Sequence, residues 1–251
     1  MAPARGVTVT AGRLRTGTSG FAYPAWSPRF YPAGLRSADL LRHYASRLGT
    51  VELNNTFYRM PTAAAIDGWL AATPSDFRFA VKAQKGGSWR AIRMDPTESV
   101  PWLTTPLRPF RERLGTVLFR VPEGVQRDDE RLAAMLAVWP RDLPLAMEFQ
   151  EASWHVDETF AALERAGAAL CATELPDDPE PPTMRRTGSF LYLRLRRHDY
   201  DAEAIAAWAS RVEPFLTSGD DVYVFFRHDE VGRGAELALE LRDALAAVGQ
   251  R

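Results

Sequence analysis

The amino-acid sequence predicts a (β/α)8 barrel of the TIM type, folded as a single domain over residues 13–251. Eight short runs of β-forming residues recur along the 251-residue chain, and segments with helical periodicity separate most of them. The length suits one large domain, and no break in composition divides the chain. The alternative, an open doubly wound sheet, would need a glycine-rich phosphate-binding turn to support a nucleotide function, and the sequence contains none.

The elements are expected in strict alternation. Branched and aromatic residues predict strands at 13–19, 50–56, 77–83, 116–122, 144–150, 169–174, 190–195 and 221–228. Apolar periodicity predicts helices at 37–48, 62–73, 127–139, 156–167, 201–216 and 234–248. Ser37 is the expected N-cap of the first helix, and Gly167 is the expected C-cap of the fourth. We expect a lead-in at residues 1–12, an irregular segment at 84–115 and a surface loop at 174–183.

Charge and cysteine content exclude several classes of protein. The chain has 31 Lys and Arg against 32 Asp and Glu, so it carries no general electrostatic footprint for nucleic acid or an anionic membrane. The single cysteine, Cys171, excludes an internal disulfide framework. No run of about 20 apolar residues and no secretory signal is present, so a soluble cytoplasmic protein is expected. No cofactor is expected, and the oligomeric state is left open.

Side chains alternate across a strand, so each run has two faces. The consistently apolar face must lie under the helices, and the other face must point into the barrel. The last inward members are polar or charged, and active sites of this fold lie at the carboxyl ends of the strands. The predicted ring of such residues is Glu52, Asn54, Lys82, Arg120, Glu148, Glu174, Arg194 and Arg227.

Six stretches of the chain resemble one protein family. They are GTSGFAYPAWSPRFYP (17–32), VELNNTFYRMP (51–61), FRFAVKA (77–83), LGTVLFRVP (114–122), AMEFQEASW (146–154) and VYVFF (222–226). In these stretches the chain is similar to the domain of unknown function 72 family, the YecE-like proteins, over residues 14–248. The resemblance implies a TIM-barrel-like fold, in agreement with the strand phase, and it implies no particular reaction.

The family pattern is matched at some site positions and not at others. The matching residues are Glu52, Asn54, Tyr58, Lys82, Glu148 and Trp154. The departures are Arg120, Gln150, Arg227 and His228. These differences suggest a divergent member with either an altered or a lost activity.

The ring predicts an enzyme that acts on a small polar anionic substrate, phosphorylated or sugar-like, by acid/base chemistry. Lys82 is the first candidate, because the chain has only two lysines and a buried lysine can act as a base or as a Schiff-base nucleophile. Glu148 and Glu52 are the candidate acid/base carboxylates. Hydrolysis and isomerisation are both compatible with these groups.

Other residues are expected to bind the substrate. Arg120, Arg194 and Arg227 would hold its anionic group, while Asn54 and Glu174 would contact its polar groups. Aromatic side chains that follow strands one, two and five could stack on the substrate or cover it: Tyr23, Trp26, Tyr58 and Trp154.

Two other functions are compatible with the same ring. A metal-dependent phosphoesterase or nuclease would use His198-Asp199 and His228-Asp229-Glu230 together with Glu148 and Glu174, although no spacing typical of a metal site supports it. A non-catalytic binding module would have its charged ring closed by internal ion pairs, with no open cavity at the strand ends.

Overall fold

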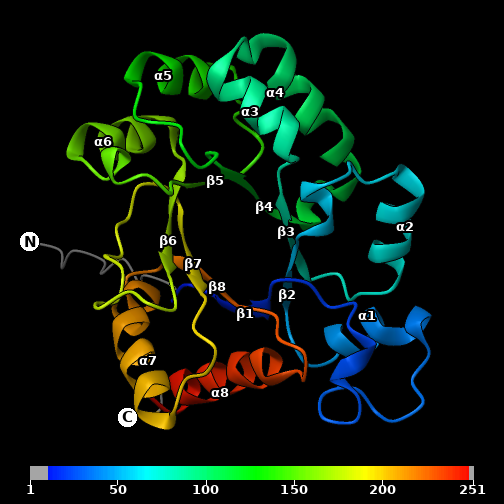
Figure 1. Cartoon of the computed structure of the whole chain (residues 1–251). Coiled ribbons are helices and arrows are strands. Elements are labelled where there is room, and N and C mark those ends of the chain that lie inside the picture. The colour runs from blue at the N-terminus through cyan, green and yellow to red at the C-terminus, as the bar shows by residue number, and fades with distance from the viewer. Residues whose placement is uncertain (1–10, 249–251) are drawn as a thin grey trace, which may run out of the picture.

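The computed structural model describes residues 11–248, which form a barrel of eight parallel strands surrounded by helices (Figure 1). The order of the strands around the barrel is β1-β8-β7-β6-β5-β4-β3-β2. They are β1 (Leu14–Thr18), β2 (Thr50–Leu53), β3 (Arg78–Lys82), β4 (Leu114–Arg120), β5 (Leu145–Glu148), β6 (Ala169–Glu174), β7 (Phe190–Leu195) and β8 (Asp221–Phe226). The predicted (β/α)8 barrel is confirmed, whereas the lead-in predicted for residues 1–12 lies almost wholly outside the described residues.

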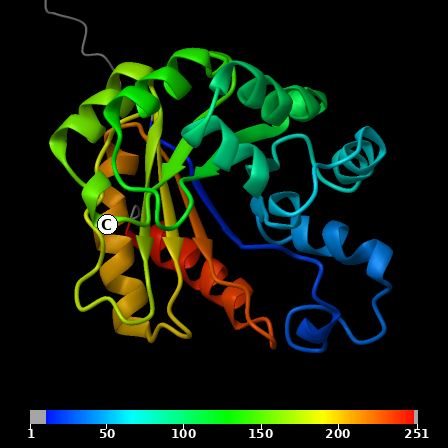
Figure 2. The same ribbon diagram turned by 45° about the horizontal axis from the view of Figure 1, so that its top comes forward.

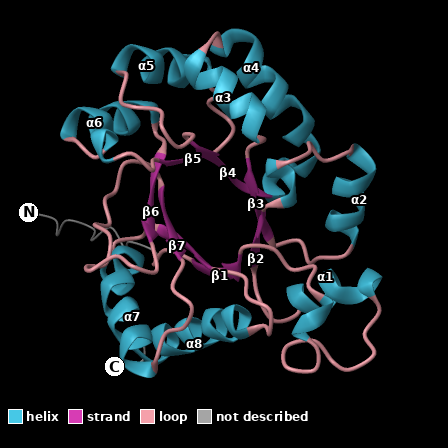
Figure 3. Ribbon diagram, in the orientation of Figure 1, coloured by secondary structure: helices cyan, strands magenta, loops and turns pink. Residues whose placement is uncertain are grey.

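The helices form an outer layer around the ring of strands (Figure 3). They are α1 (Leu40–Ala45), α2 (Ala63–Ala71), α3 (Lys85–Arg93), α4 (Pro96–Thr104), α5 (Asp129–Val138), α6 (Asp157–Ala166), α7 (Ala202–Thr217) and α8 (Arg233–Val248). Helices α7 and α8 lie against the strands β8 and β1, as the tilted view shows (Figure 2). Between β6 and β7 residues 175–189 form a loop instead of a helix, so this side of the barrel has a thinner cover. No helix in residues 11–248 has the length and apolarity that crossing a membrane requires.

Two details of the predicted helices are wrong, and a third is confirmed. Segment 84–115 is not irregular, because it contains α3, α4 and a 3-10 stretch at 105–113. Pro96 is compatible with a helix because it lies in the first turn of α4, where the backbone nitrogen has no hydrogen-bond acceptor within the helix. Ser37 lies inside a 3-10 turn and does not cap α1. Gly167 ends α6 in the left-handed region at φ 70°, as predicted.

The strand phase predicted from the sequence is confirmed for six strands, β2, β3, β4, β5, β7 and β8. Small and aromatic side chains fill the barrel interior, and the alternate positions pack under the helices. The interior residues are Ala80, Leu118, Ala146, Ala169, Cys171, Phe190, Tyr192, Tyr223 and Phe225. Strand β6 is the exception, because Ala169 and Cys171 point inward while Leu170 and Ala172 pack with the outer core.

The barrel is incompletely hydrogen-bonded at two places. Strands β1 and β2 pair only at the bridge between Ser19 and Glu52. The two strands also approach closely at Gly17, where a Cβ atom would lie only 2.2 Å from the Thr50 carbonyl oxygen. Strands β5 and β6 pair only at Ala146–Ala169 and Met147–Leu170. Beyond those pairs no further ladder pairing joins β5 and β6, and residues at the ends of both strands line a cavity.

Candidate functional site

A cluster of buried charges lies at the carboxyl end of the barrel. The Arg194 guanidinium binds the Glu52 carboxylate through two hydrogen bonds, from Nε to Oε2 at 3.0 Å and from Nη2 to Oε1 at 2.8 Å. Its Nη1 donates to Glu148 Oε1 at 2.7 Å. All three side chains are buried. One guanidinium therefore compensates two buried carboxylates.

Glu52 has all its hydrogen-bonding capacity occupied by the protein. Besides Arg194, its carboxylate accepts hydrogen bonds from Ser19 Oγ at 2.8 Å, Tyr192 Oη at 2.7 Å and Asn54 Nδ2 at 3.1 Å. Burial alone would raise its pKa, but the Arg194 charge and the hydrogen bonds outweigh burial and hold the pKa at about 2. Glu52 is fully enclosed, so it positions Arg194 rather than facing a ligand.

Glu148 is only partly occupied. Its Oε1 accepts hydrogen bonds from Arg194 and from Thr173 Oγ1, the latter at 3.0 Å. Its Oε2 lies 3.5 Å from Arg120 Nε, and neither of these two buried atoms has a hydrogen-bond partner. Burial opposes ionisation, but the charges of Arg194, Arg120 and Lys82 outweigh it and lower the pKa of Glu148. Glu148 is therefore an ionised carboxylate with one oxygen, Oε2, that accepts no hydrogen bond.

Lys82 is a buried amine without a counter-ion. Its side chain is 7% exposed, and Nζ lies 4.3 Å from the centre of the Phe57 ring. Within residues 11–248 Nζ makes no hydrogen bond or ion pair. Burial, reinforced by the Arg194 charge, lowers the pKa of Lys82 to about 8 against the opposing influence of Glu52 and Glu148. A lysine with this pKa can exchange its proton near neutral pH.

Lys82 and Glu148 line one cavity of about 580 Å³. It extends from the barrel mouth past the ends of β5 and β6 toward the loop at 175–185. Five cationic side chains and two carboxylates line it, so the charge of its wall favours an anion. The cations are Lys82, Arg120, Arg185, Arg194 and Arg196, and the carboxylates are Glu148 and Asp178.

Arg196 belongs to this site although the sequence analysis did not select it. Its Nη1 donates to Ser19 Oγ at 3.2 Å, and within the described range it has no carboxylate partner. It follows Arg194 by two residues, so strand alternation continued past the end of β7 would have placed it on the same side. Thr173 was also missed, and a correct phase for β6 would have selected it.

The structure places Glu174 outside the ring. It lies in the opposite phase to Thr173, receives a hydrogen bond from Tyr200 Oη at 2.5 Å and pairs with Arg197 at 2.9 Å. The prediction that Glu174 points into the barrel is wrong, because the apolar alternation of β6 was ambiguous. Arg227 lies at the rim, where its Nη1 is 3.2 Å from His198 Nδ1, and it does not line the cavity.

The four aromatic candidates lie in three different settings. Trp26 and Trp154 are fully buried, with their indole N–H groups bonded to the carbonyl oxygens of Asp229 and Val125. Tyr23 is half-buried and stacks on His228. Tyr58 is 79% exposed and lines a second hollow of about 520 Å³ next to Phe57. None of these four residues lines the main cavity, so the function proposed below does not use them.

The metal-dependent alternative has no ligand set in the part of the chain that the structure describes. There, no three His, Cys, Asp or Glu side chains converge as metal ligands would. Glu52, Glu174 and His198 are engaged with arginines or hydroxyl groups, and Glu148 is engaged through Oε1.

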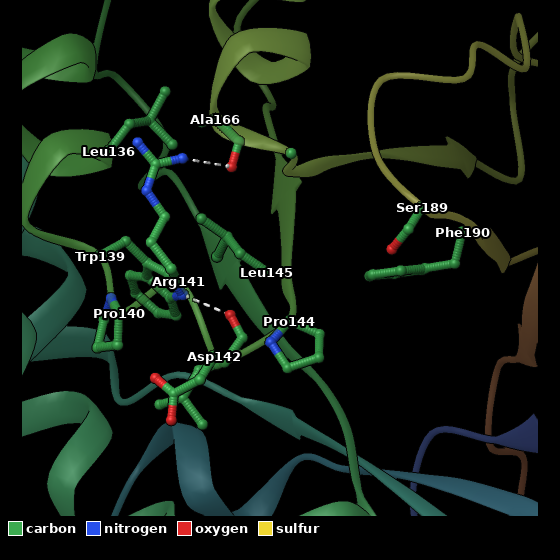
Figure 4. A pocket seen from close by; sticks show the side chains of 12 residues that line it. Leu136, Trp139, Pro140, Arg141, Asp142, Pro144, Leu145, Ala166, Ser189 and Phe190 are labelled. Carbon is green, nitrogen blue, oxygen red and sulfur yellow. Dashed lines mark hydrogen bonds between the residues drawn. The ribbon is translucent and has the colours of Figure 1, made fainter.

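A further hollow lies at the opposite end of the barrel, away from the charged cluster. It measures about 160 Å³ and is lined mainly by the α5–β5 connection and the end of α6 (Figure 4). The Arg141 side chain crosses the hollow, and its Nη1 donates a hydrogen bond to the Ala166 carbonyl oxygen at 3.5 Å. Its size and its position at the amino ends of the strands favour packing rather than catalysis.

Comparison with known proteins identifies the family. A DUF72 family protein from Thermotoga maritima has 26% sequence identity and a TM-score of 0.81, over 93% of this chain and 99% of that one. A DUF72 family protein from Enterococcus faecalis has 22% identity and a TM-score of 0.78, over 93% and 96% of the two chains. The UPF0759 protein YunF of Bacillus subtilis (strain 168) is 24% identical over 86% of this chain and 89% of its own length. Residues 15–251 match the family described as protein of unknown function DUF72, and the chain belongs to that family.

Proposed function

We propose that this protein is an enzyme acting on a small polar anionic substrate, phosphorylated or sugar-like, by acid/base chemistry in the cavity at the carboxyl end of the barrel. One observation carries the proposal: the cavity combines an excess of cations with a lysine amine that has no ion pair in the described residues and a Glu148 oxygen that accepts no hydrogen bond. Unsatisfied buried groups are rare in proteins, and a ligand that contacts them would satisfy them.

The roles of the residues follow from their contacts. Arg120 and Arg196, which lack hydrogen-bonded carboxylate partners, bind the anionic group of the substrate. Lys82 transfers a proton, because its pKa lies near neutral pH. Glu148 stays ionised and is the base that accepts a proton through Oε2. Arg194 and Glu52 hold this arrangement in place and do not themselves meet the substrate.

The non-catalytic alternative requires a ring closed by internal ion pairs. The pairs of Arg194 with Glu52 and Glu148 meet that requirement. Lys82 does not, because it remains unpaired in the described part of the chain and faces an open cavity. A structural network gains little from a desolvated amine that has no ion-pair partner, whereas such amines are typical of active sites.

Inorganic phosphate tests the proposed anion site. We expect Arg120→Gln and Arg196→Gln to weaken phosphate binding about ten-fold or more, because each removes a charged donor from the cavity. The control is Arg108→Gln, which removes an exposed arginine paired with Asp142 far from the cavity. Isothermal titration calorimetry of the four proteins measures this. Absence of binding to the wild-type protein, or equal affinity in all four, would contradict the proposal.

A further inference from the structure

We propose that Lys82 is a covalent nucleophile, and that the substrate is an anionic carbonyl compound that forms an imine with its Nζ. This inference rests on the proposed function and narrows its substrate class. It depends on the position of one amine relative to the cavity, to the nearby cations and to Glu148.

The surroundings of Nζ leave it free to react. A lysine that serves only for charge is normally paired with a carboxylate or extends into water. Nζ instead packs against the face of Phe57 at 4.3 Å and borders the cavity, and its side chain is 7% exposed. Burial and the nearby Arg194 charge lower its pKa to about 8, which leaves roughly a tenth of the amine neutral at pH 7.

Arginine could not perform this reaction. The chain uses arginine for 29 of its 31 cationic residues and lysine for only two, Lys82 and Lys85. Arginine binds anions at least as well as lysine, and it stays charged in proteins. The cavity already has three arginines at the ends of two other strands, Arg120 at the end of β4 and Arg194 and Arg196 at the end of β7. A lysine among them supplies a nucleophilic amine, which the arginines cannot.

The reaction needs only groups that line the cavity. Neutral Nζ adds to the carbonyl carbon, the carbonyl π bond becomes a C–O single bond, and the nitrogen proton passes through Glu148 to that oxygen. Loss of the hydroxyl group with one further proton releases water and leaves a C=N bond. Amine and carbonyl thus give imine and water, with no oxidation or reduction. Arg120 and Arg196 would hold the carboxylate or phosphate of the compound.

Reductive trapping with pyruvate and sodium cyanoborohydride tests the inference. The hydride converts the imine into a stable carboxyethyl-lysine, which peptide mass spectrometry locates. Because Lys85 is exposed at the start of α3, each sample contains its own reference lysine. We expect Lys82 to be labelled at least about ten-fold faster than Lys85 near pH 7, because burial keeps about a tenth of the Lys82 amine neutral and the cavity binds pyruvate beside it. Excess phosphate should slow labelling of Lys82 and leave Lys85 unaffected.

The controls separate this inference from the proposed function. Lys82→Arg keeps the positive charge and should eliminate the fast labelling, while Lys85→Arg should preserve it. Lactate, which has the same charge but no carbonyl group, should give no adduct. If phosphate binds in the cavity but Lys82 is labelled no faster than Lys85, the imine inference is wrong and the anion site stands. If phosphate does not bind and Lys82 is not labelled, both proposals fail.

Discussion

Replacing Arg194 by methionine is expected to lower the free energy of unfolding by about 3–5 kcal/mol. The change removes the one guanidinium that hydrogen-bonds both Glu52 and Glu148. Both carboxylates are buried, so Glu52 would lose its ion-pair partner and Glu148 would keep only the 3.5 Å ion pair with Arg120. Equilibrium unfolding in urea at neutral pH measures the loss.

An exposed ion pair supplies the matched control. Arg185 pairs with Asp157, and these side chains are 40% and 87% exposed. Arg185→Met should therefore cost less than about 1 kcal/mol. Adding Glu52→Gln to Arg194→Met should recover part of the loss, since one buried negative charge is removed with its partner. Equal losses for Arg185→Met and Arg194→Met would show that the buried network contributes no more than a surface pair.

Replacing Lys82 by methionine is expected to have the opposite effect and raise the free energy of unfolding by about 1–3 kcal/mol at pH 7. The depressed pKa of Lys82, about 8 against an ordinary 10.5, means that folding disfavours its charged form. Methionine fills a similar volume without a charge. The same variant should lose reductive trapping by pyruvate.

The pH dependence of this stabilisation has a definite sign. Between about pH 8 and 10.5 the unfolded chain holds the Lys82 proton and the folded chain has released it. The unfolded state then binds more protons, so wild-type stability gains from rising pH in this window. The advantage of Lys82→Met should therefore shrink from pH 8 to 10.5. Urea unfolding at pH 7, 8 and 9 follows the change, with the exposed Lys85→Met as control. A Lys82→Met protein less stable than wild type at pH 7 would contradict this account.

These two substitutions distinguish site residues that stabilise the fold from a site residue that destabilises it. Arg194 and Glu52 are expected to stabilise the barrel, and their contacts are complete within the protein. Lys82 is expected to lower the free energy of unfolding, and its amine has no hydrogen bond or ion pair within the described residues. Residues that destabilise the fold in which they lie are characteristic of active sites.

Strand phase accounts for most of the site that could be predicted from the sequence. The alternation along β3, β4, β5 and β7 correctly placed Lys82, Arg120, Glu148 and Arg194 at one end of the barrel interior. It failed at β6, because ALCATE has small residues in both phases and Glu174 was assigned to the wrong face. A one-residue change of phase moves every side chain to the other face.

Other features depend on tertiary contacts that no local pattern encodes. Helices α3 and α4 lie in a proline-rich segment, where capping by Gln84 and Asp95 and packing between the two helices outweigh weak propensity. The pairing of β5 with β6 is short beside the cavity, and neither strand shows this in its sequence. The ion pairs could not be predicted either, because a predicted ring of charged residues does not show which cation binds which carboxylate.

The titration of the lysine side chains tests most directly the central claim, that the cavity contains a desolvated amine ready for chemistry. In protein labelled with ¹³C-lysine only Lys82 and Lys85 give signals, and Lys85→Arg assigns them. We expect Lys82 to titrate with a midpoint near pH 8, and phosphate in the cavity to raise this midpoint. A Lys82 midpoint at 10.5 or above in the free protein would contradict the claim.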